Sequence, residues 1–375
     1  MSPAGDLAGH YTRFRVADRL LLTGHAHQAW PDVAREGVLE AYDDAALDVD
    51  RKWARAEDRA ERLRAGVRVL MDEPGAEIAL GASAHELLVR FLSALPLRSR
   101  PRLVTTDGEF DSARRQLDRL PEIGVEVVRV PAAPVETLAE RLAALVDART
   151  AAVVVSSVLF ESARIVPGLA SVAEACERVG SELLVDAYHQ LGVVPLSVVD
   201  SGLAGAWIVG GGYKYLQLGE GNCFLRVPPH ASRMRPVVTG WFAHEADRFA
   251  GSTYDPTSHY RAARVLDFFV EQGLTPPRLR EISLHQRGLL ARGFDALDLP
   301  DEVLTRDRAT PAEGFGGFLA LVSPQAARLR AALAERGVHA DHRGQHLRLG
   351  PAPYLTDDQL TEAIGLLGEA VACLR

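Results

Sequence analysis

Residues 182–189 read ELLVDAYH and residues 206–216 read AWIVGGGYKYL. Each stretch begins with a short apolar run and continues into polar or glycine-rich sequence, as a buried strand does where it enters a loop. Runs of this kind occur at residues 77–80, 102–105, 126–130, 151–155, 182–185, 206–209 and 223–227. Helical patterns lie among them at residues 84–95, 112–120, 135–146 and 169–179. This alternation predicts an α/β domain whose mostly parallel, seven-stranded sheet is flanked by helices.

The sequence on either side of this domain predicts two further parts. Residues 1–60 are expected to form a helical segment that packs on the large domain, which spans residues 61–256. After residue 256 the pattern changes, with helices expected at 259–272, 278–294, 324–337 and 356–374 and strands at 317–322 and 346–350. Residues 257–375 are therefore predicted to form a smaller α+β domain.

The charge and composition limit the partners of this chain. Its 375 residues include 42 basic and 50 acidic side chains, a net charge of −8, and 47% of them are hydrophobic. Nucleic acids and anionic membranes select clustered positive charge, so we expect neither as a partner. No apolar stretch approaches the roughly 20 residues that span a bilayer, and Met1–Asp6 lacks the features of a signal peptide. The three cysteines, Cys176, Cys223 and Cys373, show no metal-ligand spacing, so we expect no metal site and a cytoplasmic location.

Lysine is rare in this chain. Of the 42 basic residues two are lysine, Lys52 and Lys214, which leaves 42 − 2 = 40 arginines. An arginine stays protonated, whereas a lysine amine can lose its proton and form a Schiff base. Lys52 lies in a charged segment typical of a solvated helix face. Lys214 follows an apolar run and three glycines, so it is either an ordinary loop residue or a functional one.

A carboxylate lies at a matching place in the predicted sheet. Asp186 ends the run at 182–185 and is followed closely by His189. Ligands of open α/β sheets bind at the carboxyl ends of the strands, where Asp186 and Lys214 would face one crevice. Pyridoxal 5′-phosphate requires this pair, because a lysine forms its imine and an acid stabilises its protonated ring nitrogen. The alternative is that Asp186 caps a helix or stabilises a turn.

Such a cofactor also needs a phosphate site and a cover for its ring. Residues 81–86, GASAHE, follow a predicted strand and open a predicted helix, whose backbone N–H groups can bind phosphate. Ser83 and Glu86 also fit a capping box, so an ordinary strand–helix turn explains the same residues. Phe110 either covers one face of the ring or belongs to the core.

Three motifs resemble kynureninase, within the class V aminotransferase superfamily of fold type I enzymes. They are DAYH at 186–189, GYKYL at 212–216 and GWFAH at 240–244, in the same order and at similar intervals. Near the end of the chain, RLGPAPYL at 348–355 resembles the R-x-x-P-x-P-L-Y segment, and LTGHA at 22–26 lies where the family has D-G-N-S-L-G. The resemblance implies the fold type I architecture, pyridoxal 5′-phosphate as cofactor and a homodimer.

The resemblance implies roles for individual residues. Lys214 would form the imine and carry protons, Asp186 would pair with the ring nitrogen, and His189 would support the ring. Phe110 would stack on the ring. The implied phosphate contacts are Ser83, Ala84, Tyr213 and Trp241, with Thr257 or Ser258 reaching across a dimer interface.

The substrate side departs more from the family than the cofactor side. Arg348, rather than Arg343, would bind the α-carboxylate, and His25 stands in place of an asparagine of the substrate site. The ring-stacking loop is FDSA at 110–113 instead of F-P-T-D, which leaves open whether Asp111 replaces the acid missing at Ala113. VLFE at 158–161 replaces V-N-Y-R and loses its polar and cationic members.

Three functions follow from these observations. The first is a kynureninase-like hydrolysis of a Cβ–Cγ bond, which turns a kynurenine-type amino acid into an anthranilate-type product and alanine. The second is another reaction of the same scaffold: C–S lyase, β-elimination, epimerisation or class V transamination. A cysteine desulfurase is disfavoured because none of the cysteines falls on a mobile loop of the small domain. The third is a non-catalytic binding protein with this fold.

Overall fold

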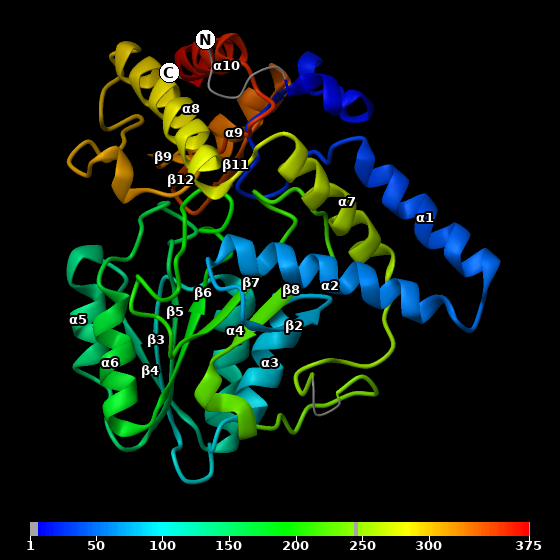
Figure 1. Ribbon diagram of the computed structural model, residues 1–375. Helices are drawn as coiled ribbons and strands as arrows, with labels where there is room; N and C mark the ends of the chain where they lie inside the picture. The colour runs from blue at the N-terminus through cyan, green and yellow to red at the C-terminus, as the bar shows by residue number, and fades with distance from the viewer. Residues whose placement is uncertain (1–6, 244–246, 375) are drawn as a thin grey trace.

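The computed structural model describes residues 7–243 and 247–374, and its centre is a seven-stranded sheet (Figure 1). The order across the sheet is β2-β8-β7-β6-β5-β3-β4. The strands are β2 (Glu77–Gly81), β3 (Arg102–Thr106), β4 (Glu126–Val130), β5 (Thr150–Ser156), β6 (Glu182–Asp186), β7 (Trp207–Gly211) and β8 (Cys223–Val227). Strand β8 pairs antiparallel with both of its neighbours, and the other pairs are parallel. The predicted fold class is confirmed.

Helices cover both faces of this sheet. They are α2 (Lys52–Leu70), α3 (Ala84–Ala94), α4 (Asp111–Arg119), α5 (Leu138–Ala143) and α6 (Leu169–Val179). Successive residues of a strand point to opposite faces. Thus Leu183 and Val185 join one core with α2, α5 and α6, whereas Leu184 joins a second core with α3 and α4. Burial on both faces explains why these strands read as continuous apolar runs rather than alternating ones.

The C-terminal part is smaller and mixed. It contains helices α7 (Thr257–Glu271), α8 (Pro276–Ala296), α9 (Ala326–Glu335) and α10 (Asp357–Leu374), and strands β9 (Leu319–Val322), β10 (Val338–His339), β11 (Asp341–Arg343) and β12 (His346–Leu349). Strands β11, β12 and β9 form an antiparallel sheet. Figure 1 shows this part above the large sheet, with α8, α9 and α10 on its outer side. The short strands β10 and β11 were missed by the sequence analysis, because two or three residues carry no periodicity.

The N-terminal residues contact both larger parts. Strand β1 (Leu20–Leu21) pairs in parallel with β10 of the C-terminal part. Helix α1 (Val33–Leu47) packs along α7, and α2 packs against α7 and β2. The expected boundary at residue 60 falls inside α2, which is continuous from Lys52 to Leu70 because its buried face continues to the end. The N-terminal segment therefore packs on the C-terminal part as well as on the large domain. The division of the chain into three domains stays a prediction.

One buried ion pair joins β8 to the loop before β2. The Arg226 guanidinium is 1% exposed and donates to both Glu73 carboxylate oxygens, at 2.8 and 2.5 Å. It also donates to the Ala204 and Ala206 carbonyl groups. This guanidinium has no access to water, so it depends on these acceptors.

We expect Glu73→Ala to lower the free energy of unfolding by roughly 3–5 kcal/mol, because it leaves a buried charge without its counter-ion. Urea unfolding followed by circular dichroism measures the loss. The control is Glu122→Ala, which removes the partner of an exposed arginine, Arg119, and is expected to cost no more than about 1 kcal/mol. Equal losses in the two variants would contradict the role of the buried pair.

No helix among the described residues is long and apolar enough to cross a membrane.

Candidate active site

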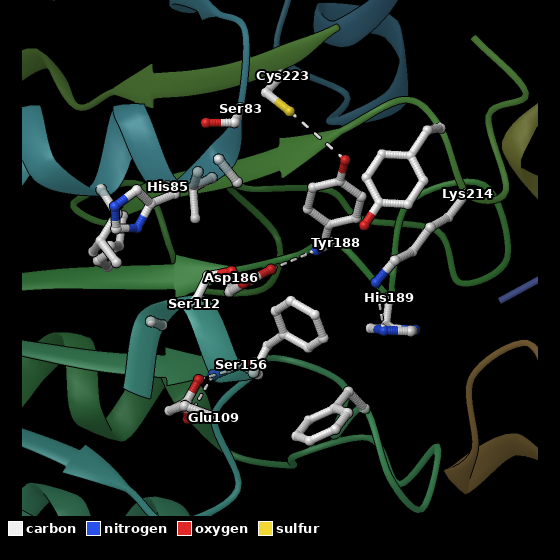
Figure 2. A pocket seen from close by; sticks show the side chains of 18 of the residues that line it. Ser83, His85, Glu109, Ser112, Ser156, Asp186, Tyr188, His189, Lys214 and Cys223 are labelled. Atoms are coloured by element: carbon white, nitrogen blue, oxygen red, sulfur yellow. Dashed lines mark hydrogen bonds between the residues drawn. The ribbon is translucent and has the colours of Figure 1, made fainter. Parts of the chain in front are cut away.

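A cavity of about 260 Å³ opens at the carboxyl ends of the parallel strands (Figure 2). Its walls come from the loops that follow β2, β3, β5, β6 and β7, and from the first residue of the antiparallel β8. The predicted site residues on its wall are Ser83, Ala84, Phe110, Asp186, His189, Tyr213 and Lys214. Ala82 and Cys223, which are 223 − 82 = 141 positions apart in sequence, thus share one cavity because the strand ends meet at one edge of the sheet.

Asp186 is the last residue of β6. Its Oδ1 accepts the backbone N–H of Tyr188 at 2.8 Å, which holds the carboxylate at the cavity wall. Burial raises the pKa of Asp186, while the Tyr188 N–H and the Lys214 ammonium group favour the charged form. The site therefore holds an acid whose charge depends on a nearby cation.

Lys214 follows β7 by three residues and is 6% exposed. Its Nζ lies 2.7 Å from His189 Nε2, and Figure 2 shows both groups at the same end of the cavity. Burial lowers the pKa of Lys214 to about 7, Asp186 opposes this shift, and Arg348 adds to it. Burial and the Lys214 charge lower the pKa of His189 well below its usual value. Near neutral pH the amine is therefore partly unprotonated and able to act as a nucleophile.

Three aromatic rings surround the Lys214 amine. Nζ lies 4.6 Å from the ring centroid of Tyr188, 5.4 Å from that of Phe110 and 5.8 Å from that of Tyr213. The face of an aromatic ring stabilises a nearby cation, but it carries no net negative charge. A flat ligand bound next to Nζ must therefore lie against aromatic surfaces.

The start of α3 closes one end of the cavity. Ser83 caps this helix, since its side chain accepts the Glu86 N–H at 3.2 Å, and Glu86 Oε2 accepts the Ala82 N–H at 2.9 Å. The Ser83 half of the predicted capping box is present, but Glu86 accepts the N–H of Ala82 rather than that of Ser83. Ser83, Ala84 and His85 still line the cavity, so the Ser83 hydroxyl proton and the helix start remain possible donors to an anion.

A second carboxyl group on the wall was missed by the sequence analysis. Glu109 is buried and accepts hydrogen bonds from Thr106 Oγ1 at 2.6 Å and from Ser156 Oγ at 2.6 Å. Burial raises its pKa to about 7, although both hydroxyls favour the charged form. The only sequence signal was its place beside Phe110. Asp111, in contrast, is ion-paired with Arg114 and lies off the cavity, so it supplies no acid there.

Arg348 and His25 lie behind the cavity wall. Arg348 is 3% exposed and donates to the Phe160 carbonyl at 2.6 Å and to Asp341 Oδ2 at 2.5 Å. His25 is fully buried, and its Nε2 lies 3.8 Å from the same Asp341 oxygen. Neither residue lines the cavity, and Arg348 Nε is buried without a hydrogen-bond partner among the described residues. Their substrate-binding roles stay predictions.

The remaining predicted phosphate contacts lie apart from the cavity. Trp241 is 75% exposed and is not on its wall. Thr257 begins α7, where its hydroxyl donates to Asp255, and it lines a neighbouring cavity of about 740 Å³ together with Ser258. Gly221 lines both cavities. His244 of the third motif lies outside the described residues.

The residues present fit the group that the sequence predicts. A partly unprotonated amine, a carboxylate and a helix start suit an aldehyde, a ring nitrogen and a phosphate, respectively. His189 Nδ1 is buried without a hydrogen-bond partner in the described part of the chain, which leaves it free for a ligand. Over residues 7–243 and 247–374, no group of three or more His, Cys, Asp or Glu side chains is placed to hold a metal ion.

The strand order, the single antiparallel strand and the cavity at the strand ends agree with the fold type I architecture expected from the sequence. No protein-family model matches the sequence. An uncharacterised aminotransferase of Bacillus subtilis (strain 168), YcbU, is 25% identical over 338 residues, which cover 87% of this chain and 88% of that protein.

Solved structures share the architecture over nearly the whole chain. The cystine C–S lyase C-DES, in complex with its reaction product cysteine persulfide, has a TM-score of 0.80 at 17% identity and covers 94% of this chain and 98% of its own. The cysteine desulfurase CsdA of Escherichia coli has a TM-score of 0.79 at 16% identity, with 100% and 99% covered. A NifS-like protein has a TM-score of 0.76 at 19% identity, with 95% and 100% covered. At these identities the likeness establishes the fold alone, and it does not support the narrower resemblance to kynureninase.

Proposed function

We propose that this chain is a pyridoxal 5′-phosphate-dependent enzyme that acts on an amino acid. The observation that carries the proposal is the buried Lys214 amine, which shares one cavity with the Asp186 carboxylate and with a helix start. The fold supports it, as does the covalent link between glycine and the pyridoxal phosphate cofactor in another C-DES structure, with a TM-score of 0.83. The relative in Bacillus subtilis, described as an aminotransferase, points to the same class.

Each residue has a physical task in this proposal. When bound, the cofactor supplies an aldehyde for bonding to amines and a protonated ring that withdraws electrons from the substrate. Lys214 Nζ would hold the cofactor through its aldehyde, with loss of water, and as a free amine it would take the Cα proton of the substrate. Asp186 would supply the negative charge that a protonated ring nitrogen needs. His189, within 2.7 Å of Nζ, accepts or returns a proton at that amine.

Among the possible reactions, C–S cleavage by β-elimination is favoured over Cβ–Cγ hydrolysis. Elimination needs a base for the Cα proton and a leaving group on Cβ. Hydrolysis additionally needs a water held at the γ-carbonyl carbon. Val158 and Phe160, which line the cavity, replace the family segment that carries polar and cationic side chains, and their side chains cannot hold such a water. The two C–S-cleaving neighbours named above point in the same direction.

A persulfide-forming desulfurase is disfavoured by the cysteines. Cys176 is buried on α6, and Cys373 lies on α10 next to the Arg336 guanidinium. Cys223 does line the cavity, but it is held in β8 with its Sγ 3.6 Å from Tyr188 Oη, and burial raises its pKa to about 11. A thiol in this state is a poor nucleophile.

Product analysis tests the function. The holoprotein is incubated separately with cysteine, cystine and kynurenine, and pyruvate, sulfide and anthranilate are measured. We expect pyruvate and a reduced sulfur product from the sulfur amino acids and no anthranilate. Release of anthranilate and alanine from kynurenine would instead support the kynureninase-like hydrolysis. A protein that takes up no pyridoxal 5′-phosphate would indicate a non-catalytic binding protein.

The rate of cofactor attachment should depend on pH in a characteristic way. Since burial lowers the pKa of Lys214 to about 7, the unprotonated fraction increases about tenfold between about pH 6 and pH 8 and is then nearly complete. We expect the rate of yellow colour formation after mixing with pyridoxal 5′-phosphate to follow this curve and to level off above about pH 8. A rate that keeps increasing to about pH 10 would instead indicate a lysine with an ordinary pKa of about 10.4.

A further inference from the structure

Glu109 is a buried carboxyl group of the cavity wall to which no role has yet been given. It follows β3 by three residues and is 2% exposed. Its hydrogen-bond partners in the described part of the chain are neutral. Oε1 accepts the Thr106 hydroxyl at 2.6 Å and the Ser156 N–H at 3.2 Å, and Oε2 accepts the Ser156 hydroxyl at 2.6 Å. These three donors fix the carboxyl group in place but give it no counter-ion.

Ser156 joins this carboxyl group to the strand that carries Asp186. It is the last residue of β5, and it lies opposite Asp186 in the parallel pairing of β5 with β6. The next residue, Ser157, donates its N–H to the Asp186 carbonyl group at 2.9 Å. Figure 2 shows the Glu109 carboxyl group linked to Ser156 below Asp186. Both carboxyl groups line the same cavity, so the sheet holds them at adjacent strand ends.

Charged and titratable groups reach the surroundings of Glu109 from every loop of the cavity. Next to it in the chain, Asp107 accepts the Ala132 N–H, and Asp111 is paired with Arg114. The other loops and β8 contribute His85, Asp186, Tyr188, His189, Tyr213, Lys214, Glu220 and Cys223 to the wall. Burial raises the pKa of Glu109 to about 7, and the charge of Asp186 adds to this shift, whereas the Lys214 ammonium group favours the charge on Asp186. The cation of the cavity therefore stabilises Asp186, and Glu109 meets a like charge.

Two carboxyl groups in one buried cluster do not ionise independently. The group that ionises first makes the second ionisation harder, so the pair carries one negative charge over a range of pH. Asp186 ionises first because an ammonium group stabilises it, and Glu109 follows. A cation bound beside Asp186 compensates the charge of Asp186 and so removes the repulsion that keeps the proton on Glu109.

We propose that Glu109 and Asp186 are a coupled pair that holds one proton near neutral pH, and that Glu109 releases this proton when a cationic group binds beside Asp186. On release the Glu109 O–H bond breaks, the carboxylate keeps the electron pair and the proton goes to the solvent. The pair then carries two negative charges, which favours a protonated ring nitrogen. Glu109 acts through Asp186 and is a positioning residue. The release rests on the proposed function, because it presumes a protonated pyridine ring at Asp186, but the coupling in the unliganded protein does not.

The first test titrates both carboxyl groups in the protein without cofactor. Carbon-13 NMR of protein labelled at the side-chain carboxyl carbons of Glu and Asp gives the midpoints, and the Glu109 signal is the one that Glu109→Gln lacks. We expect a Glu109 midpoint near pH 7. In Asp186→Asn it should be lower by at least about one pH unit, because the like charge is gone. Asp111→Asn, which removes an ion-paired carboxylate two residues from Glu109 and outside the cavity, is the matched control and should leave the midpoint unchanged.

A second test keeps the inference falsifiable if Asp186→Asn fails to fold. The probe is 4′-deoxypyridoxine 5′-phosphate, which has the ring and the phosphate but no aldehyde and therefore leaves Lys214 free. Calorimetry at neutral pH in two buffers with different heats of ionisation counts the protons exchanged on binding. We expect the unchanged protein to release about half a proton more than Glu109→Gln, since a group is half protonated at its pKa. Protons exchanged by the probe and by Lys214 cancel in this difference.

Each outcome decides a stated claim. If Glu109 titrates near the ordinary value of about 4.3, or if its midpoint does not move in Asp186→Asn, the two carboxyl groups are independent and the inference is overturned. Equal proton counts for the unchanged protein and Glu109→Gln also overturn it. If the unchanged protein binds neither the probe nor pyridoxal 5′-phosphate, the proposed function fails, and the titration alone decides whether the two carboxyl groups are coupled.

Discussion

Replacing Lys214 with alanine should abolish the covalent attachment of pyridoxal 5′-phosphate. This amine is buried in the cavity, and its pKa is lowered to about 7, so it is the group able to bond to an aldehyde at neutral pH. Borohydride reduction of the loaded protein followed by peptide mass analysis should place the cofactor on Lys214 in the unchanged protein. In Lys214→Ala we expect no labelled peptide and no visible absorption band.

Lys52→Ala is the matched control, since Lys52 is the other lysine of the chain. Lys52 begins α2, away from the cavity wall, with its Nζ 6.0 Å from the Trp53 ring centroid. This variant should keep both the colour and the labelled peptide. Labelling at Lys52, or full labelling of Lys214→Ala, would contradict the assignment of the site.

Replacing Asp186 with asparagine should slow the removal of the Cα proton by about two to four orders of magnitude. The asparagine keeps the shape of the side chain and can still accept the Tyr188 N–H, but it has no charge to balance a protonated ring nitrogen. Removing one partner of a buried charge pair costs roughly 3–5 kcal/mol, which corresponds to this loss of rate. Exchange of the Cα hydrogen of an amino acid with deuterium, followed by NMR, measures the step whichever reaction follows it.

Two control variants separate this effect from a general loss of negative charge. Asp111→Asn removes a carboxylate that is paired with Arg114 outside the cavity and should leave the exchange rate unchanged. Glu109→Gln removes the second carboxyl of the cavity wall. Its pKa of about 7 makes it partly neutral already, so the change should be much smaller than for Asp186→Asn. If the exchange rate falls by a similar factor in Asp186→Asn and Glu109→Gln, Asp186 is not the specific source of the negative charge, and the prediction is wrong.

Much of the fold could be predicted from the sequence because its central strands are buried on both faces. Such strands leave long apolar runs, and the predicted limits of β4 and β8 agree with the structure. The order of the strands could not be predicted, since apolar runs do not specify which runs pair. The pairing of β1 with β10 was also out of reach, because two-residue strands depend on contacts far along the chain.

The residues of the site also fall into those that the sequence indicated and those that it did not. Lys214, Asp186 and His189 were singled out because each is a chemically distinctive residue at the end of a strand or within three residues of it. Glu109 and Tyr188 were overlooked because carboxyl groups and phenols are common in loops. The contact between Arg348 and Asp341 could not be foreseen, and the substrate-binding role of Arg348 stays a prediction. Sequence spacing carries no information about such a neighbour.

The amino acid order alone therefore determined the α/β class, the unusual lysine and the chemistry that a lysine and an acid at strand ends can support. These are local properties, because the pattern of apolar residues and the chemistry of each side chain can be read directly from the sequence. Folding settled which groups surround the Lys214 amine and how far burial shifts its proton equilibrium. These depend on distances between segments that are remote in sequence, and a backbone reaches such an arrangement only when the whole sheet is assembled.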